Sequence, residues 1–434
     1  MKGIIGIRHE DKYILERRAA LTPKHVESLI NQGIEVLVES SEKRIFTDAE
    51  YKAAGAQVSN TISNAGLIFG VKEMPLNYFE DNKTYVFFSH TIKGQEYNMD
   101  MLKKMVEAKI NLIDYEKITD EQGRRLIFFG RFAGLAGMIN SFWSYGERLK
   151  RLGYSNCFES LTQTRHYRSL EDAKEAIKKI GELIKTKGLN ADVGPLIIGV
   201  TGYGNVSNGA QEIIDLLPVK EISPQELLQL SGQNAFALNC VYKIVFKEVD
   251  ISTPINPDCG FELQDYYEHP EKYKNSFEQY VPHLSILMNC MYWNENYPRI
   301  VTKDFLEQLY KTNHRLKVIG DITCDPDGSI EATHMGTKIQ DPVFVYNPST
   351  RIPTMGFEGD GILIMAVDIL PSELPRESSE AFGNVLVKYV KDLAEADYKV
   401  GFDALNIPAE FKRALILHNG EFTPDYYYMK DFLK

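Results

Sequence analysis

Short apolar runs alternate with amphipathic helical patterns along most of the chain, and this alternation constrains the fold more than any other feature. Apolar runs of this length, each followed by a helix, are typical of strands buried in a parallel sheet. The sequence therefore predicts an α/β fold. The predicted strands are 3–7, 34–38, 65–71, 85–88, 110–113, 195–200, 316–322 and 361–367, and the predicted helices are 22–30, 132–152, 169–187, 210–217 and 378–394.

The chain is long enough for more than one domain. Its 434 residues correspond to two or three domains at roughly 150 residues each. The long helix predicted at 132–152 is suited to link two of them. Residues 223–300 carry many tyrosines, asparagines and prolines and show weaker periodicity, so we expect an insertion or an extended loop region there.

Charge and cysteine usage exclude several classes of protein. The formal net charge is −11, whereas nucleic-acid-binding proteins are more often basic. The five cysteines form no CxxC pair, which argues against a zinc site or a disulfide framework. No apolar run reaches the roughly 18 residues of a membrane span, and the first residues lack the apolar stretch of a signal peptide. We therefore expect no metal, no nucleic acid, no membrane partner and a cytoplasmic location, with an organelle matrix as the alternative.

A glycine-rich loop follows the predicted strand at 195–200. Two glycines stand between this strand and a helical pattern, and a serine replaces the third glycine of the dinucleotide-binding fingerprint. Glycines at such a turn let backbone N–H groups approach a pyrophosphate at a helix N-terminus. The loop predicts a dinucleotide site, with a plain strand-to-helix turn as the alternative. The predicted cofactor-binding residues of the loop are Gly202, Gly204, Asn205, Val206, Ser207 and Gly209.

An acidic residue is expected about 20 positions after such a loop, at the end of the second strand. Glu221 is the candidate, and it would accept the ribose hydroxyls of NAD. Lys220 beside it would instead pair with the 2′-phosphate of NADP, so both cofactors stay open at this point.

Polar side chains follow several predicted strands in the first part of the chain. Lys72 and His90 each stand just beyond an apolar strand, at the sheet edge where parallel α/β sheets bind ligands. Lysine and histidine in such places act as proton donors and acceptors. Further charged residues are of the types that pair with a substrate carboxylate or ammonium group, although each of them, taken alone, is more often part of a surface ion pair. They are Arg18, Lys93, Glu116 and Arg125.

These motifs together resemble one family of enzymes. The chain resembles lysine-ketoglutarate reductase, also called saccharopine dehydrogenase (lysine-forming), and more distantly alanine dehydrogenase and the transhydrogenase nucleotide-binding subunit. The matching runs are ERRAALTP at 16–23, GVKE at 70–73, FFSHTIK at 87–93, DYEK at 114–117, AGLAGMIN at 133–140, GYGNVSNGAQ at 202–211, DITCDPDGSIE at 321–331, GDGILI at 359–364 and LPSELPRE at 370–377.

The resemblance implies two Rossmann-like α/β domains with an interdomain cleft. Residues 1–134 and 366–434 would form the substrate domain, and residues 135–365 would form the dinucleotide-binding domain with the insertion at about 223–300. The implied reaction condenses lysine with 2-oxoglutarate and reduces the imine with NAD or NADP in reduced form, NADPH being favoured, to give saccharopine. We expect a stand-alone reductase, with a homo-oligomer possible.

The resemblance also implies residue roles. Lys72 and His90 would be the acid/base pair, Arg18 and Arg125 would hold carboxylates, and Lys93 and Glu116 would bind substrate or tune the site. Asp325 matches an aspartate near the catalytic centre of the alanine dehydrogenase branch. The rival hypotheses are an alanine dehydrogenase-like oxidative deaminase and a non-catalytic dinucleotide-binding regulator.

Overall fold

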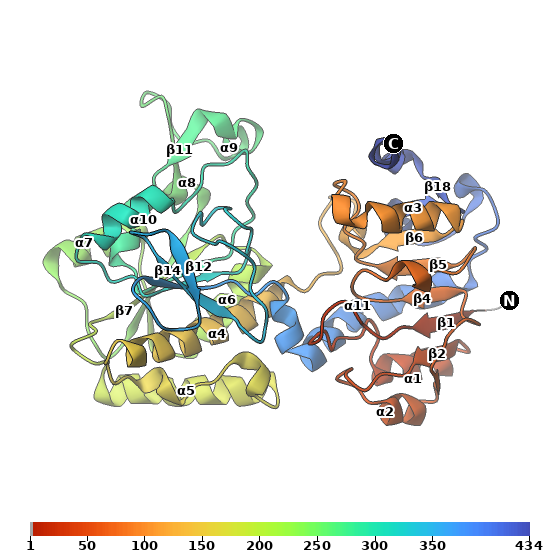
Figure 1. Ribbon diagram of the computed structural model, residues 1–434, viewed down its shortest axis with the longest axis horizontal. Coiled ribbons are helices and arrows are strands. Elements are labelled where there is room, and N and C mark those ends of the chain that lie inside the picture. Colours follow the sequence, from red (N-terminus) through yellow and green to blue (C-terminus); the bar gives the residue numbers. More distant parts are fainter. Residues whose placement is uncertain (1–2) are drawn as a thin grey trace. The chain divides into compact units, whose positions relative to one another are not determined.

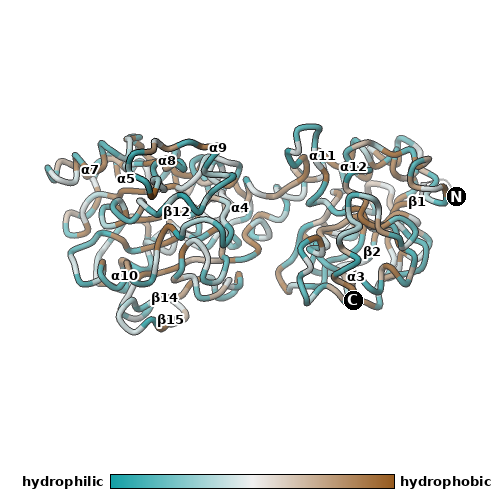
Figure 2. The backbone as a smooth tube through the Cα atoms, turned by 90° about the horizontal axis from the view of Figure 1, so that it is seen from above, coloured by the Kyte–Doolittle hydropathy of each residue, from teal (hydrophilic) through white to brown (hydrophobic). Residues whose placement is uncertain are grey.

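The structure is a computed structural model that describes residues 3–434, and it divides into two compact units (Figure 1). Unit 1 consists of residues 1–129 and 375–434, and unit 2 of residues 130–374. Figure 2 shows that hydrophobic segments recur in the interior of each unit while hydrophilic ones dominate the outer loops.

Unit 1 is built on an eight-stranded sheet with the order β18-β17-β6-β5-β4-β1-β2-β3. All neighbouring pairs are parallel except those made by β17 and β18. The strands are β1 (Ile4–Ile7), β2 (Glu35–Glu39), β3 (Gln57–Ser59), β4 (Leu67–Phe69), β5 (Thr84–Phe87), β6 (Asn111–Asp114), β17 (Leu415–His418) and β18 (Glu421–Phe422). The helices are α1 (Pro23–Asn31), α2 (Asp48–Ala53), α3 (Met99–Glu107), α11 (Pro375–Glu395) and α12 (Ala409–Arg413).

The C-terminal segment completes the core of unit 1. Strand β17 pairs with β6, and α11 contributes Phe382, whose ring stacks on Phe129 at 4.5 Å between centroids. At the other end, α1 begins as its sequence predicts, because Thr22 adopts the extended N-cap conformation and Pro23 occupies the first turn.

Unit 2 is built on a second eight-stranded sheet with the order β15-β14-β16-β13-β12-β7-β9-β8, in which β14 pairs antiparallel with both β15 and β16 and the other pairs are parallel. Its strands are β7 (Leu196–Thr201), β8 (Val219–Glu221), β9 (Val241–Phe246), β12 (Ile286–Asn289), β13 (Val318–Asp321), β14 (Val343–Asn347), β15 (Ile352–Met355) and β16 (Ile362–Met365), with β10 (Ser252–Pro254) and β11 (Tyr273–Asn275) in a separate ribbon. The helices are α4 (Gly130–Arg151), α5 (Leu170–Lys187), α6 (Asn205–Ile214), α7 (Pro224–Gln233), α8 (Glu248–Ile251), α9 (Leu263–Glu268) and α10 (Lys303–Tyr310).

The expectation of an insertion at 223–300 is wrong for much of that region. Strands β9 and β12 pair with β7 on either side, so the region supplies two central strands of the sheet. The run Val241–Phe246 is interrupted by Lys243, which is buried and forms ion pairs with Asp215 and Glu221. Because the charged Lys243 interrupts the apolar run, the sequence pattern did not predict this strand.

Helices α4 and α6 approach each other closely because each carries a glycine at the contact. A methyl group at Gly134 would overlap the carbonyl oxygen of Val206, and one at Gly209 would overlap that of Arg131. Among residues 3–434, no helix is long and apolar enough to cross a membrane.

Candidate functional site

The candidate site of unit 1 lies where its strand order reverses. Strand β1 stands between β2 and β4, so the loops after β1 and β4 diverge and leave room for a ligand at their carboxyl ends. Glu10, in the loop after β1, accepts hydrogen bonds from the backbone N–H groups of Val71 (2.7 Å) and Lys72 (2.8 Å). This carboxylate fixes the backbone that carries Lys72.

His90 follows the neighbouring strand β5 and is held in an unusual backbone conformation. Its φ of +48° lies in the left-handed region, which non-glycine residues seldom adopt outside constrained sites. The side-chain amide of Asn98 donates to the carbonyl oxygens of Ser89 (3.2 Å) and His90 (3.1 Å) and stabilises this turn. The imidazole Nδ1 lies 2.7 Å from Oε1 of Glu73.

Glu73 sets the tautomer of His90. Burial raises the pKa of Glu73, but hydrogen bonds from His90 and Lys12 outweigh burial and lower it to about 2. The ionised carboxylate can only accept hydrogen bonds, so Nδ1 of His90 carries a proton. Nε2 is therefore the atom that takes up or releases a proton, as general acid/base chemistry requires.

Arg18 is buried and already paired within the protein. Its Nε and Nη2 donate to the two carboxylate oxygens of Glu16 at 2.8 and 2.6 Å, and its guanidinium lies 4.1 Å from the ring centroid of Phe129. Burial raises the pKa of Glu16, but the charge and hydrogen bonds of Arg18, together with the charge of Lys72, lower it overall. Glu16 thus interacts with Arg18 and Lys72, and Glu73, the residue after Lys72, interacts with His90.

The remaining predicted residues lie less centrally. Arg125 forms an ion pair with Glu116, and both side chains are partly exposed; the backbone N–H of Glu116 donates to Asp114 at 2.7 Å. Lys93 is exposed in the loop after His90. Asp325 lies in unit 2, in the exposed turn that follows β13.

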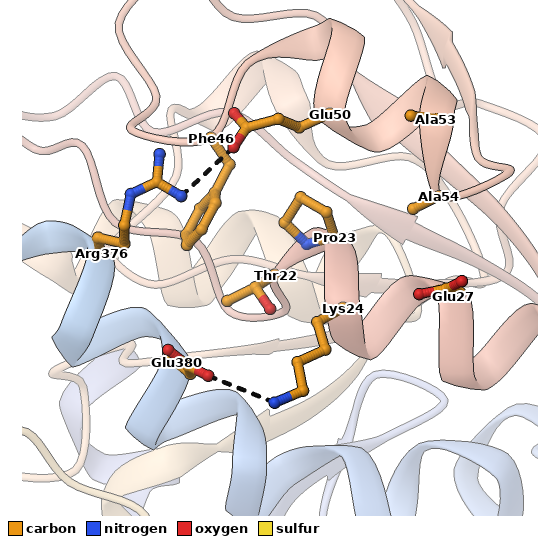
Figure 3. Close-up of a pocket in the computed structure, with 10 residues that line it drawn as sticks. All are labelled: Thr22, Pro23, Lys24, Glu27, Phe46, Glu50, Ala53, Ala54, Arg376 and Glu380. Atoms are coloured by element: carbon orange, nitrogen blue, oxygen red, sulfur yellow. Dashed lines mark hydrogen bonds and ion pairs between the residues drawn. The ribbon is translucent and has the colours of Figure 1, made fainter.

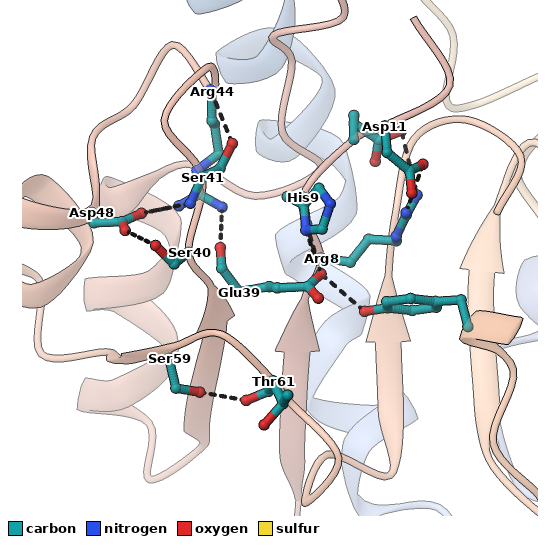
Figure 4. A network of polar contacts seen from close by, with 12 residues as sticks. Arg8, His9, Asp11, Glu39, Ser40, Ser41, Arg44, Asp48, Ser59 and Thr61 are labelled. Carbon is teal, nitrogen blue, oxygen red and sulfur yellow. Dashed lines mark hydrogen bonds and ion pairs between the residues drawn. The ribbon is translucent and has the colours of Figure 1, made fainter. Parts of the chain in front are cut away.

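Sequence reasoning missed a buried polar network at the ends of β1 and β2 (Figure 4). Nη2 of Arg8 pairs with Asp11 at 2.8 Å, and its guanidinium lies 4.6 Å from the ring centroid of Tyr78. Glu39 accepts from the backbone N–H of His9 and from the hydroxyl of Tyr78, each at 3.1 Å. The signal was present, because the first strand runs directly into four polar residues, Arg-His-Glu-Asp at 8–11.

The glycine-rich loop of unit 2 also lies at a reversal of strand order, since β7 stands between β9 and β12. Gly202 has a φ of +77° and turns the chain, and Gly204 is the N-cap of α6 without a side-chain cap. The exposed residues Gly204 and Asn205 and the half-buried Val206 leave the N-terminus of α6 accessible, which fits a pyrophosphate.

Two of the predicted cofactor-binding residues are buried within unit 2 and do not face the open side of the loop. Ser207 is buried and its hydroxyl accepts from Gln211 at 3.0 Å. Gly209 is buried against α4, as described above. Their places indicate packing of α6 rather than contact with a cofactor.

Glu221 does not lie where the sequence predicted. It ends β8, which is the edge strand beyond β9, and it pairs in register with Lys243 near the middle of β9. The strand beside β7 is β9, and the acidic residue just after it is Glu248. Glu248 accepts hydrogen bonds from Tyr203 (3.4 Å) and Tyr267 (2.7 Å). The spacing of about 20 residues pointed to the wrong residue, because the first strand after α6 is β8, which lies at the edge of the sheet and not beside β7.

A cavity of about 320 Å³ lies beside the glycine loop. Gly202, Gly204 and Glu248 line it together with five tyrosines, which are Tyr203, Tyr266, Tyr267, Tyr292 and Tyr297. Aromatic faces and a carboxylate beside a glycine turn suit a nucleoside.

Comparisons with known proteins identify the family models and the fold that this chain matches. Two family models match the chain: the alanine dehydrogenase/PNT N-terminal domain over residues 6–136, and the alanine dehydrogenase/PNT C-terminal domain over residues 246–425. Two solved structures share its fold. An L-alanine dehydrogenase matches with a TM-score of 0.64 and 17% identity, covering 99% of this chain and 100% of that one. A transhydrogenase from Sinorhizobium meliloti matches with a TM-score of 0.58 and 15% identity, covering 97% and 100%. The predicted α/β fold with two Rossmann-like domains is confirmed.

Curated relatives match over nearly the whole chain. The alpha-aminoadipic semialdehyde synthase of Arabidopsis thaliana is 39% identical over 98% of this chain and 41% of the relative. The mitochondrial alpha-aminoadipic semialdehyde synthase of Mus musculus is 35% identical over 99% and 48%. A saccharopine dehydrogenase (NAD(+), L-lysine-forming) of Candida albicans is 27% identical over 91% and 93%. The chain spans about half the length of the first two relatives.

Proposed function

Because the chain belongs to the alanine dehydrogenase/PNT family, we propose that it is a nicotinamide-dinucleotide-dependent oxidoreductase that joins lysine to 2-oxoglutarate and reduces the product to saccharopine, or runs the reverse reaction. The observation that carries the proposal is the cluster in which Lys72 and His90 follow neighbouring parallel strands and Glu73 orients His90. Unit 1 is assigned to the substrates and unit 2 to the dinucleotide.

The chemistry needs two proton-transfer groups. The ε-amine of lysine attacks the keto carbon of 2-oxoglutarate, and loss of water leaves an imine. One group takes the proton of the attacking ammonium, and another protonates the departing hydroxyl. Lys72 and Nε2 of His90 divide these tasks. A reduced dinucleotide, when bound, would supply a hydride to the imine carbon, and the imine nitrogen takes a proton to become the secondary amine of saccharopine.

Charged residues around the pair hold the substrates. Arg125 and Lys93 are accessible enough to meet a substrate carboxylate, and Glu116 meets an ammonium group. Arg18 attracts a substrate carboxylate while it stays ion-paired with Glu16. The substrates carry three carboxylates between them, which is why several cations are needed.

Oxidation of reduced dinucleotide tests the proposal. Purified protein is mixed with NADH or NADPH, lysine and 2-oxoglutarate, and each component is omitted in turn while the absorbance of the reduced nicotinamide is followed. We expect oxidation only when both substrates are present. Oxidation with pyruvate and ammonia, and none with lysine, would instead identify an oxidative deaminase. Dinucleotide binding without turnover on either substrate pair would indicate a regulator.

We further propose that the dinucleotide is NAD rather than NADP. Glu248 is the second residue after β9, the strand beside β7, and it lines the cavity at the glycine loop. A carboxylate in this place accepts the ribose hydroxyls of NAD and repels the 2′-phosphate of NADP. The name of the Candida albicans relative also specifies NAD(+). This proposal departs from the preference for NADPH that the sequence resemblance implies.

The ratio of kcat/KM for NADH to that for NADPH tests the role of Glu248. We expect Glu248→Gln to lower this ratio about tenfold or more, because a hydrogen bond to a charged group is lost together with the repulsion of phosphate. Glu221→Gln, on the edge strand, is the matched control and should leave the ratio unchanged. A change in the Glu221 variant alone would return the role to Glu221.

A further inference from the structure

A cavity in unit 2 lies at the edge of the sheet opposite the glycine loop. It measures about 660 Å³. Pro195, Ser285 and Lys317 line it, and each directly precedes a strand, respectively β7, β12 and β13. These strands are parallel neighbours, so the cavity lies at their amino ends, whereas the glycine loop follows the carboxyl end of β7. The cavity is therefore separate from the proposed dinucleotide site.

Cations without carboxylate partners line this cavity. Arg315 and Lys317 face it together with His283 and His314. Among residues 3–434, neither Arg315 nor Lys317 has a side-chain ion pair or hydrogen bond, and the one acidic residue of the lining, Asp192, is exposed and forms no ion pair. Burial, Arg148 and Arg315 all lower the pKa of Lys317. Partly buried like charges repel each other and are costly without a counter-charge.

The local backbone is arranged to hold these cations in place. Gly194 has a φ of +84°, and a methyl group there would lie 2.7 Å from Nη1 of Arg315, so glycine makes room for the guanidinium. Backbone hydrogen bonds from Arg315 to Pro282 (3.1 Å) and from Lys317 to Ser285 (3.0 Å) fix the segment.

Two further polar atoms of the lining lack partners within the chain. Nδ1 of His314 and the hydroxyl of Ser231 are buried and form no hydrogen bond within the part of the chain that the structure describes. Buried polar atoms are nearly always hydrogen-bonded in folded proteins. Their presence beside two unpaired cations is a second indication of a ligand.

A cavity in unit 1 provides the contrast (Figure 3). It measures about 450 Å³ and is lined by residues of α1, α2 and α11. Its cations are neutralised within the chain, since Arg376 pairs with Glu50 at 3.3 Å and Lys24 with Glu380 at 3.6 Å. The lack of ion pairs in the unit 2 cavity is thus a local property of that cavity.

We propose that the unit 2 cavity binds a small organic anion with at least two negative charges, carried by carboxylate or phosphate groups. The volume falls within the range of small-molecule sites. The fork of Arg315 and the point charge of Lys317 both suit these oxyanions. This inference is independent of the proposed reaction.

Calorimetric titration of the full-length protein tests the site. Citrate, glycerol 3-phosphate and inorganic phosphate serve as probes at neutral pH, with sodium chloride holding the ionic strength constant. We expect saturable binding of citrate or glycerol 3-phosphate, and the two probes distinguish a carboxylate ligand from a phosphate ligand. Lys317→Gln and Arg315→Gln should each weaken binding about tenfold or more, as expected for a lost charge-assisted hydrogen bond.

Lys24→Gln is the matched control, because it removes the same charge beside the unit 1 cavity. The affinity of this variant for each probe should equal that of the unchanged protein. Loss of binding in this control to the same degree as in Lys317→Gln would show only general charge attraction and would overturn the proposal. Absence of saturable binding by all three probes would overturn it as well. The two unit 2 variants give independent readings, and far-UV circular dichroism verifies that each is folded.

Discussion

At the scale of single residues, the proton chemistry depends on Lys72 and His90. If they form the acid/base pair, Lys72→Met and His90→Gln each remove one proton-transfer step. We expect kcat to fall by about 10²-fold or more in each variant, while the dissociation constant of the dinucleotide, measured by fluorescence titration, stays nearly unchanged because unit 2 is untouched. A loss of less than about tenfold in both variants would refute the assignment.

Glu73 offers a finer test, because it acts through His90. Glu73→Gln replaces an obligate acceptor by a group that can also donate, so the proton on Nδ1 is no longer fixed. We expect kcat to fall while the KM values of both substrates change little, because the proton-transfer atom of His90 is no longer fixed but substrate binding is untouched. Glu73→Asp, which keeps an obligate acceptor, should restore part of kcat. A loss of kcat that Glu73→Asp leaves unrestored would point to a purely structural role.

The sequence identified the strand ends but not the partners of these side chains. Lys72 and His90 were recognisable because each stands just past an apolar run. Glu73 and Glu16 were present in the same motifs, yet their pairing with His90 and Arg18 depends on side-chain directions that spacing does not encode. The case of Glu221 is different, since strand order across the sheet, rather than distance along the chain, determines which acidic residue lies beside the glycine loop.

At the scale of elements, one buried carboxyl group ties several parts of unit 2 together. Glu373, in the 3₁₀ turn Leu370–Glu373, accepts from the side chains of Asn140 on α4 (2.7 Å) and Gln163 (3.2 Å) and from the backbone of Arg165 (3.1 Å). Burial raises its pKa from 4.5 to about 7, against the opposing effect of these hydrogen bonds. Because the folded state holds this proton more tightly than the unfolded state, the contribution of Glu373 to stability is complete below pH 4.5 and is lost as the pH rises to about 7.

Glu373→Gln removes this titration. The free energy of unfolding of the variant, relative to that of the unchanged protein, should rise by about 3 kcal/mol between the two ends of this pH window. Urea unfolding of both proteins at each end of the window measures the difference, and groups common to both cancel. A difference that is independent of pH would show that Glu373 does not change its protonation on unfolding in this range.

At the scale of the whole molecule, the two units differ in how the chain builds them. Unit 2 is one continuous segment, 130–374, whereas unit 1 joins 1–129 to 375–434. The C-terminal segment supplies β17, which pairs with β6, and Phe382, which is buried in the core of unit 1. The resemblance of the ends of the chain to one family allowed this discontinuous arrangement to be expected, but no periodicity within residues 1–129 indicates that their core is incomplete.

This difference predicts unequal behaviour of the two parts when they are expressed alone. A fragment of residues 130–374 keeps its complete sheet and its glycine loop, so it should unfold cooperatively and bind NADH. A fragment of residues 1–129 lacks β17 and α11 and leaves the apolar face around Phe129 uncovered, so it should be insoluble or unfold without a cooperative transition. Circular dichroism during thermal unfolding measures both, and adding the 375–434 segment to 1–129 through a short glycine-serine linker should restore the transition. A cooperative transition in the bare 1–129 fragment would show that the C-terminal segment docks on a core that is already complete.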